Sequence, residues 1–98
     1  MHSSTACGAL KNGVCLEIRY DGFTRDVEVH AVGISTAGHP VMRVWQVRGR
    51  SVHNEPIGWK LLCVDEAIGI TLLKEKSNAP RPGYKRGDRE MTTILCQL

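Results

Sequence analysis

The sequence predicts a mostly β fold, a small curled antiparallel barrel of about five strands with a short N-terminal helix. Three observations predict it. A chain of 98 residues is long enough for one domain only. Short apolar-rich runs recur along the chain, and turn-forming residues separate them. The composition, 42% hydrophobic and 23% charged, is ordinary for a globular protein. We therefore treat residues 1–98 as a single domain, with a barrel core at 14–73 and a basic, Pro/Gly-rich C-terminal segment at 74–98.

The chain is expected to begin with a short helix at residues 3–13. Ser3 or Ser4 can cap its first turn, and Gly13 can close its last turn. Apolar and polar residues alternate at 14–20, which predicts a first strand with one buried face.

A hairpin is expected next. Residues 26–34 alternate in polarity and predict the second strand, in which Gly33 marks a bulge or a sharp bend. The polar stretch 35–40 turns the chain, and residues 41–47 form the third strand.

The second half of the barrel is predicted from shorter signals. Residues 48–56 form a polar loop, 57–64 a fourth strand, 65–67 a tight break and 68–73 a fifth strand. The third and fourth strands carry apolar residues on both faces. One face of a sheet does not need that much apolar surface, so the helix, the C-terminal segment or a second subunit is expected to cover the other face.

The C-terminal segment is basic. Residues 74–90 contain six Lys or Arg and three Asp or Glu, so the formal charge of +3 of the chain lies here. Two X-Pro steps and two glycines predict a loop up to residue 88, and residues 89–98 lean toward a short strand. Tyr84 could anchor this loop on the barrel, and Arg81, Lys85 and Arg86 could extend a basic groove.

The cysteines and the terminal sequence indicate the compartment. Cys7, Cys15, Cys63 and Cys96 show no spacing that suits zinc. No secretory signal and no membrane-spanning run is recognisable. We therefore expect a cytoplasmic protein, free thiols and no membrane partner.

The order of elements resembles the WYL domain, a small Sm/SH3-like barrel that in bacteria usually follows a winged helix in transcription regulators. Residues 9–84 carry the resemblance. The matching positions lie in or next to the first, second and fourth strands: Ile18, Tyr20, Arg25, Val27, Glu28, His30, Trp59, Leu61, Val64 and Asp65. The chain departs from the family pattern at Val29, which replaces a proline, at Cys63, which replaces an arginine, and at Val41–Arg43, which replaces the Trp-Tyr-Leu triplet. The resemblance implies a stand-alone regulatory module that binds nucleic acid or a nucleotide-like anion.

The candidate binding residues combine cations, a stacking ring and polar donors. Arginine forms two parallel hydrogen bonds with a phosphate group or with the edge of a guanine, and an aromatic ring stacks on bases. The expected set is Arg25, His30, Arg43, Trp45, Gln46 and Lys60. Two structural alternatives stay open, namely that the tryptophans are core residues and that Arg43 pairs with Glu28 across the hairpin.

Other classes of function stay open beside ligand binding. Excess apolar surface on the third and fourth strands could make the protein an interaction or self-association module with no small ligand. The stretch 33–38 resembles, less closely, the loop with which PilZ domains bind a cyclic dinucleotide, and it otherwise reads as a hairpin turn in which Ser35 bonds its own backbone. No catalytic motif is present, so we expect no enzyme activity, no cofactor and no metal site.

Overall fold

The computed structural model describes residues 2–50 and 57–98. The part of the predicted polar loop at 51–56, with His53, lies outside the described residues. No helix of the described residues is long and apolar enough to cross a bilayer. The elements in chain order are α1 (His2–Asn12), β1 (Val14–Tyr20), β2 (Phe23–Ser35), β3 (Pro40–Gly49), β4 (Gly58–Cys63), the 3-10 turn η1 (Val64–Glu66), β5 (Gly69–Lys76) and β6 (Met91–Gln97).

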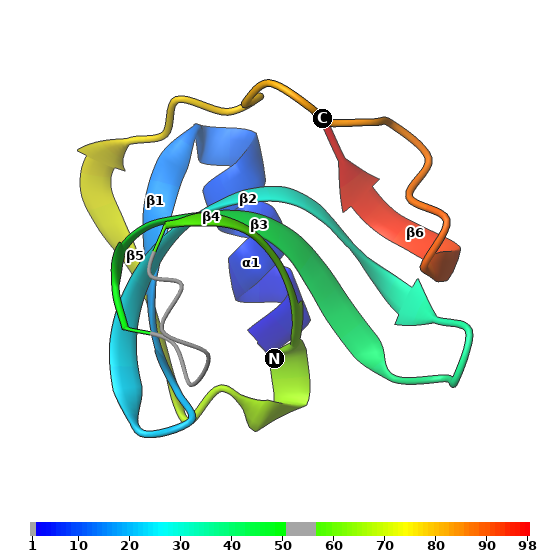
Figure 1. Ribbon diagram of the computed structural model, residues 1–98, viewed down its shortest axis with the longest axis horizontal. Coiled ribbons are helices and arrows are strands. Elements are labelled where there is room, and N and C mark those ends of the chain that lie inside the picture. Colours follow the sequence, from blue (N-terminus) through cyan, green and yellow to red (C-terminus); the bar gives the residue numbers. More distant parts are fainter. Residues whose placement is uncertain (1, 51–56) are drawn as a thin grey trace.

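The strands form one curled antiparallel sheet, and α1 lies on its concave side (Figure 1). The strand order is β4-β3-β2-β1-β5, and β6 pairs with the second half of β2. This confirms the predicted mostly β fold with an N-terminal helix. The C-terminal residues that leaned toward a strand form β6, and η1 occupies the predicted break after β4.

The main core lies between α1 and the concave face of the sheet. Small side chains at Ala6 and Ala9 let the helix approach the strands closely, and both residues are fully buried. The strands contribute alternate apolar residues, such as Leu16, Val29 and Met42, to this cluster. Each fully buried Val or Leu side chain contributes about 1.5–3 kcal/mol relative to an exposed one. Alternation along the strands therefore fixes which face of each strand is concave.

β2 is the longest strand, with 13 residues, and it holds three neighbours. Its pairing with β6 shifts register between Val32 and Gly33, which confirms the predicted irregularity at Gly33. A Cβ atom at Gly33 would lie 2.3 Å from the Thr93 carbonyl oxygen and 2.8 Å from the Met91 sulfur. The missing side chain lets β6 lie against this end of β2.

The convex face of β3 and β4 is covered by the segment 77–90, which connects β5 to β6 along the top of Figure 1. Tyr84 lies against Trp59, and the Arg81 guanidinium lies over the Trp45 ring. This confirms that another segment covers the second apolar face, and it is the C-terminal segment of the same chain. Ile57 and Leu61 remain exposed, so the self-association alternative stays a prediction.

The prediction of free thiols is wrong for two of the four cysteines. Cys7 of α1 and Cys96 of β6 form a disulfide, with their Cα atoms 6.0 Å apart, whereas Cys15 and Cys63 are free. The two partners are 89 residues apart in sequence. No local spacing reveals such a pair, because only the packing of α1 beside β6 brings it together.

The disulfide is expected to contribute strongly to stability. Closing a loop of this length destabilises the unfolded chain by about 4.6 kcal/mol in the chain-entropy model. Replacing Cys7 and Cys96 together by serine should lower the midpoint of thermal unfolding by about 10 °C or more in a domain of this size. Circular dichroism measures the midpoint, and Cys63→Ser is the matched control with little expected change. Equal midpoints for the double variant and the parent would contradict the prediction.

Candidate anion-binding site

A pocket of about 570 Å³ opens between the segment 83–90 and the convex face of β3 and β4. Its walls combine basic, acidic and aromatic side chains from three parts of the chain. The lining residues are Arg43, Trp59, Gly83, Tyr84, Lys85, Arg86, Gly87, Asp88, Arg89 and Glu90.

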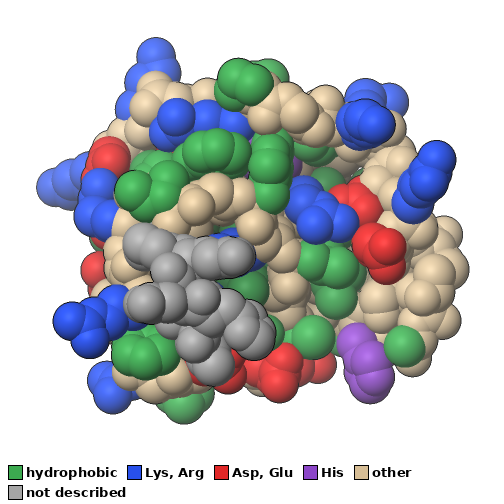
Figure 2. All heavy atoms as spheres, viewed as in Figure 1, with side chains coloured by type: hydrophobic (Ala, Val, Ile, Leu, Met, Phe, Trp, Pro, Cys, Tyr) green, Lys and Arg blue, Asp and Glu red, His purple; other side chains and the backbone are tan. Residues whose placement is uncertain are grey.

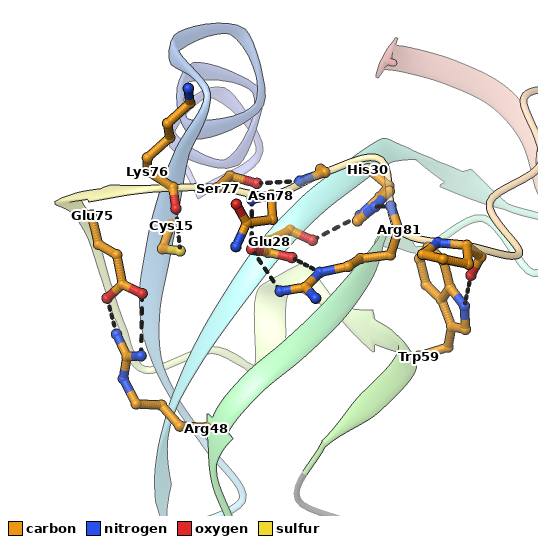
Figure 3. A network of polar contacts seen from close by, with 12 residues as sticks. Cys15, Glu28, His30, Arg48, Trp59, Glu75, Lys76, Ser77, Asn78 and Arg81 are labelled. Atoms are coloured by element: carbon orange, nitrogen blue, oxygen red, sulfur yellow. Dashed lines mark hydrogen bonds and ion pairs between the residues drawn. The ribbon is translucent and has the colours of Figure 1, made fainter.

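Aromatic contacts hold the segment against β4. The indole N–H of Trp59 donates to the Pro82 carbonyl oxygen at 3.2 Å (Figure 3). The Tyr84 ring lies 6.4 Å from the Trp59 ring, at an interplanar angle of 27°. Gly83 has a φ of 94°, and a Cβ there would lie 3.2 Å from the indole nitrogen. Glycine therefore allows the backbone to turn over the indole edge.

Arg43 and Asp88 form a two-pronged ion pair in the wall of the pocket. Nε of Arg43 donates to Oδ2 of Asp88 at 2.7 Å, and an Nη atom donates to Oδ1 at 3.2 Å. The Asp88 side chain is only 8% exposed. The guanidinium lowers the pKa of this carboxyl below its ordinary value, although burial acts in the opposite direction. Asp88 also accepts the backbone N–H of Glu90 at 2.9 Å.

The pocket carries an excess of positive charge. Its lining includes four basic and two acidic side chains. Figure 2 shows Lys and Arg side chains gathered at its upper right, where the segment between β5 and β6 runs in Figure 1, with acidic side chains among them. Lys85 and Arg89 are exposed, and Arg86 donates to the Leu98 carbonyl oxygen. Such a wall attracts anions.

A buried polar network fixes the first residues of the segment 77–90 on β2 (Figure 3). The Glu28 side chain is 1% exposed, and its two oxygens accept Nε of Arg81 at 2.6 Å and an Nη atom at 3.2 Å. The backbone N–H of Asn78 donates to the same carboxylate at 2.7 Å. A buried carboxylate is tolerated when a cation and several donors satisfy it in this way.

His30 belongs to this network. Its Nε2 accepts the backbone N–H of Arg81 at 2.9 Å, and its Nδ1 lies 3.0 Å from the Glu28 carbonyl oxygen. An amide N–H must donate, so Nε2 carries no proton and Nδ1 donates. Burial lowers the pKa of His30 below its ordinary value, which is consistent with this neutral tautomer. His30 therefore holds the segment in place and is not exposed for a ligand.

The six residues expected to bind a ligand fall into two groups. His30, Arg43 and Trp45 lie on the convex face. Lys60 pairs with Val44, whose side chain is in the concave core, so strand alternation places Lys60 on the concave side. The structure therefore does not bring Lys60 together with Arg43.

Arg25 and Gln46 are also on the concave side and are buried. Arg25 is 3% exposed, lies over the Tyr20 ring and is 3.7 Å from an Asp21 oxygen. Gln46 is fully buried and donates to the Arg50 carbonyl oxygen. Both residues are placed inside the curled sheet, away from the pocket.

The structure decides how Trp45 and Arg43 are used. Trp45 packs edge-on against Trp59, with ring centroids 5.4 Å apart, and is half-buried. The alternative that Arg43 pairs with Glu28 is wrong, because Glu28 binds Arg81 and Arg43 binds Asp88. Both partners come from the C-terminal segment, which the hairpin sequence alone does not reveal.

The turn that resembled a dinucleotide-binding loop is a plain hairpin turn. The Ser35 hydroxyl accepts the backbone N–H of His39 at 3.2 Å, and the Gly38 N–H donates to the Ser35 carbonyl oxygen. This local bonding is the expected structural role of Ser35.

Sequence reasoning found part of the pocket. It identified Arg43 and the basic residues Lys85 and Arg86, and the anchoring of Tyr84 on the barrel is confirmed. It missed Asp88 and Arg89. The sequence feature that could have indicated these two residues is the high density of charged residues in the C-terminal segment. That density does not reveal which face of the sheet the segment covers.

No family model, curated protein or solved structure matches the chain. The WYL resemblance therefore stays a prediction. Among the residues that the structure describes, no group of three His, Cys, Asp or Glu side chains could hold a metal ion.

The buried His30 should make stability depend on pH. Its folded-state pKa lies below the ordinary 6.5, so the unfolded chain binds the proton more readily. The contribution of this residue to stability is therefore complete above about pH 7 and is lost as the pH falls through 6.5 toward the folded-state pKa. A single group of this kind changes the free energy of unfolding by at most about 1.4 kcal/mol for each pH unit within that window.

Urea unfolding between pH 7.5 and pH 5.5 measures this dependence. His30→Gln should reduce the slope of stability against pH, whereas His39→Gln, at an exposed turn position, should leave it as in the parent. A slope that survives in His30→Gln would show that other groups cause it.

Proposed function

We propose that this protein is a binding module for nucleic acid or a nucleotide-like anion, and that the ligand occupies the pocket between the segment 83–90 and the convex face of β3 and β4. One observation carries the proposal. The pocket of about 570 Å³ combines an excess of basic side chains with two aromatic rings.

The chemistry of the lining suits such a ligand. Lys85 and Arg89 are exposed cations that can contact phosphate groups. Trp59 and Tyr84 are half-buried rings at a shallow angle to one another. Their hydrogen bonds to the Pro82 and Leu98 carbonyl oxygens hold both rings in place before a base arrives. Stacking of one base on such a ring is worth about 1–3 kcal/mol. The pocket size also lies within the range of about 300–1,000 Å³ that is usual for small-molecule sites.

The resemblance to WYL domains supports the same class of ligand and adds a regulatory role. In that interpretation, the barrel is a sensor whose ligand affects a partner or a neighbouring domain. The residues that line the pocket differ from the six that the sequence predicted. Of those six, Arg43 lines the pocket.

The compartment is part of the proposal. The sequence favoured the cytoplasm, but the Cys7–Cys96 disulfide counts against a reducing compartment, because disulfides persist mainly in oxidising ones. Alkylation of the protein taken directly from its source, followed by mass spectrometry, would show whether these two thiols are paired there.

The binding test compares two double variants of equal charge. Lys85→Ala with Arg89→Ala removes two cations from the pocket, and Lys11→Ala with Arg19→Ala removes two exposed cations from α1 and β1. We expect the pocket variant to bind short single-stranded oligonucleotides and nucleotides at least about fivefold more weakly at low salt, with a shallower salt dependence. The control should bind nearly as the parent does.

Tryptophan fluorescence provides the readout, because Trp59 lines the pocket. The panel contains short DNA and RNA oligonucleotides and mononucleotides at low ionic strength. Absence of binding to every member would refute the proposed function. Equal losses in both double variants would place the ligand outside the pocket.

A further inference from the structure

We propose that the pocket selects a terminal phosphate, the phosphate monoester of a nucleotide, and that the Asp88 carboxylate occupies the phosphate position at Arg43 when no ligand is bound. This inference rests on the proposed function and names the ligand group. It also assigns Asp88 a role in specificity.

The geometry of the Arg43–Asp88 pair is that of an anion site. Two guanidinium nitrogens meet two carboxylate oxygens at 2.7 and 3.2 Å, inside the pocket wall. Arginine binds carboxylate and phosphate through the same pair of parallel hydrogen bonds. A phosphate group can therefore replace the carboxylate without moving the guanidinium.

The charge decides which phosphate can compete. A carboxylate carries one negative charge, and a phosphodiester carries one as well, so exchanging one for the other at Arg43 gains little. A phosphate monoester carries about −1.5 to −2 at pH 7 and offers three acceptor oxygens. Lys85, Arg86 and Arg89 line the same pocket, so the additional charge and acceptors have cations to meet.

The displaced carboxylate has a second donor beside it. Oδ1 of Asp88 accepts the backbone N–H of Glu90 at 2.9 Å as well as an Nη atom of Arg43 at 3.2 Å. The Glu90 N–H lies two residues along the chain from Asp88, so a donor stays near the carboxylate when it turns away from Arg43. The backbone bond from the Met91 N–H to the Asp88 carbonyl oxygen is independent of the side chain and fixes the residue at the start of β6.

The aromatic wall supplies the second part of the selection. The Trp59 and Tyr84 rings lie beside Gly83 at one part of the lining, and Arg43 and Asp88 form another part. A mononucleotide presents a base and a terminal phosphate together, so it can use both parts. Inorganic phosphate uses the cations alone, and a nucleoside uses the rings alone.

Four probes separate these groups: adenosine 5′-monophosphate, adenosine, inorganic phosphate and a dinucleoside monophosphate with an internal diester only. For the parent protein we expect adenosine 5′-monophosphate to bind about fivefold or more tightly than each of the others. Equal binding of the monophosphate and the diester would overturn this inference. Oligonucleotide binding without that preference would still leave the proposed function in place.

Two variants of equal charge test the role of Asp88. Asp88→Asn and Glu90→Gln each remove one negative charge from the pocket lining, but only the first takes the carboxylate away from Arg43. We expect Asp88→Asn to increase the affinity for the diester at least about threefold more than Glu90→Gln does, and so to narrow the preference for the monoester. Equal increases in both variants would overturn the assignment of Asp88.

A third variant changes the hydrogen-bonding geometry at Arg43 while it keeps the positive charge, so the fold is expected to be less disturbed. Arg43→Lys keeps the positive charge but cannot make the two parallel bonds. Its preference for the monoester over the diester should fall by about half or more, whereas Lys11→Arg, on the exposed end of α1, should retain it. An unchanged preference in Arg43→Lys would show that the guanidinium does not receive the phosphate.

Discussion

The buried carboxylate of Glu28 determines where the segment between β5 and β6 begins its course over the sheet. It is placed on the convex face of the central strand, where water does not reach it, so it needs a cation and several donors. Arg81 and the backbone of Asn78 supply them, and His30 receives the N–H of Arg81. These bonds hold residues 78–81 on β2. Everything that follows in the chain, including the pocket, begins from that position.

The other end of the pocket segment is held by β6. Gly87 donates to the Gln97 side chain, and the Tyr84 hydroxyl and Arg86 both donate to the Leu98 carbonyl oxygen. β6 in turn pairs with β2 and is joined to α1 by the Cys7–Cys96 disulfide. The segment that forms the pocket therefore bridges two anchored ends. This explains how a segment with no regular structure presents fixed side chains.

The pocket differs in its residues from the site that the resemblance implied. The sequence pattern predicted a binding site on the β2–β3 hairpin. In the structure, His30 and Glu28 of this hairpin bind the backbone and side chain of Arg81 instead. The charged groups that remain available lie on the segment that covers this hairpin. Arg43 connects the two, because it lies on β3 and binds Asp88 of the segment.

The sequence by itself determined the mostly β class, the N-terminal helix, most of the strands, the β2–β3 turn and the irregularity at Gly33. These features follow from alternation, turn residues and glycine, which act over a few neighbouring residues. The tertiary structure alone decided the Cys7–Cys96 pair, the partners of Glu28 and Arg43, and the separation of Lys60 from Arg43. Each of these depends on residues far apart in sequence or on which face of a strand meets the helix. Local patterns do not encode such contacts, because burial of the whole core selects the face and the register.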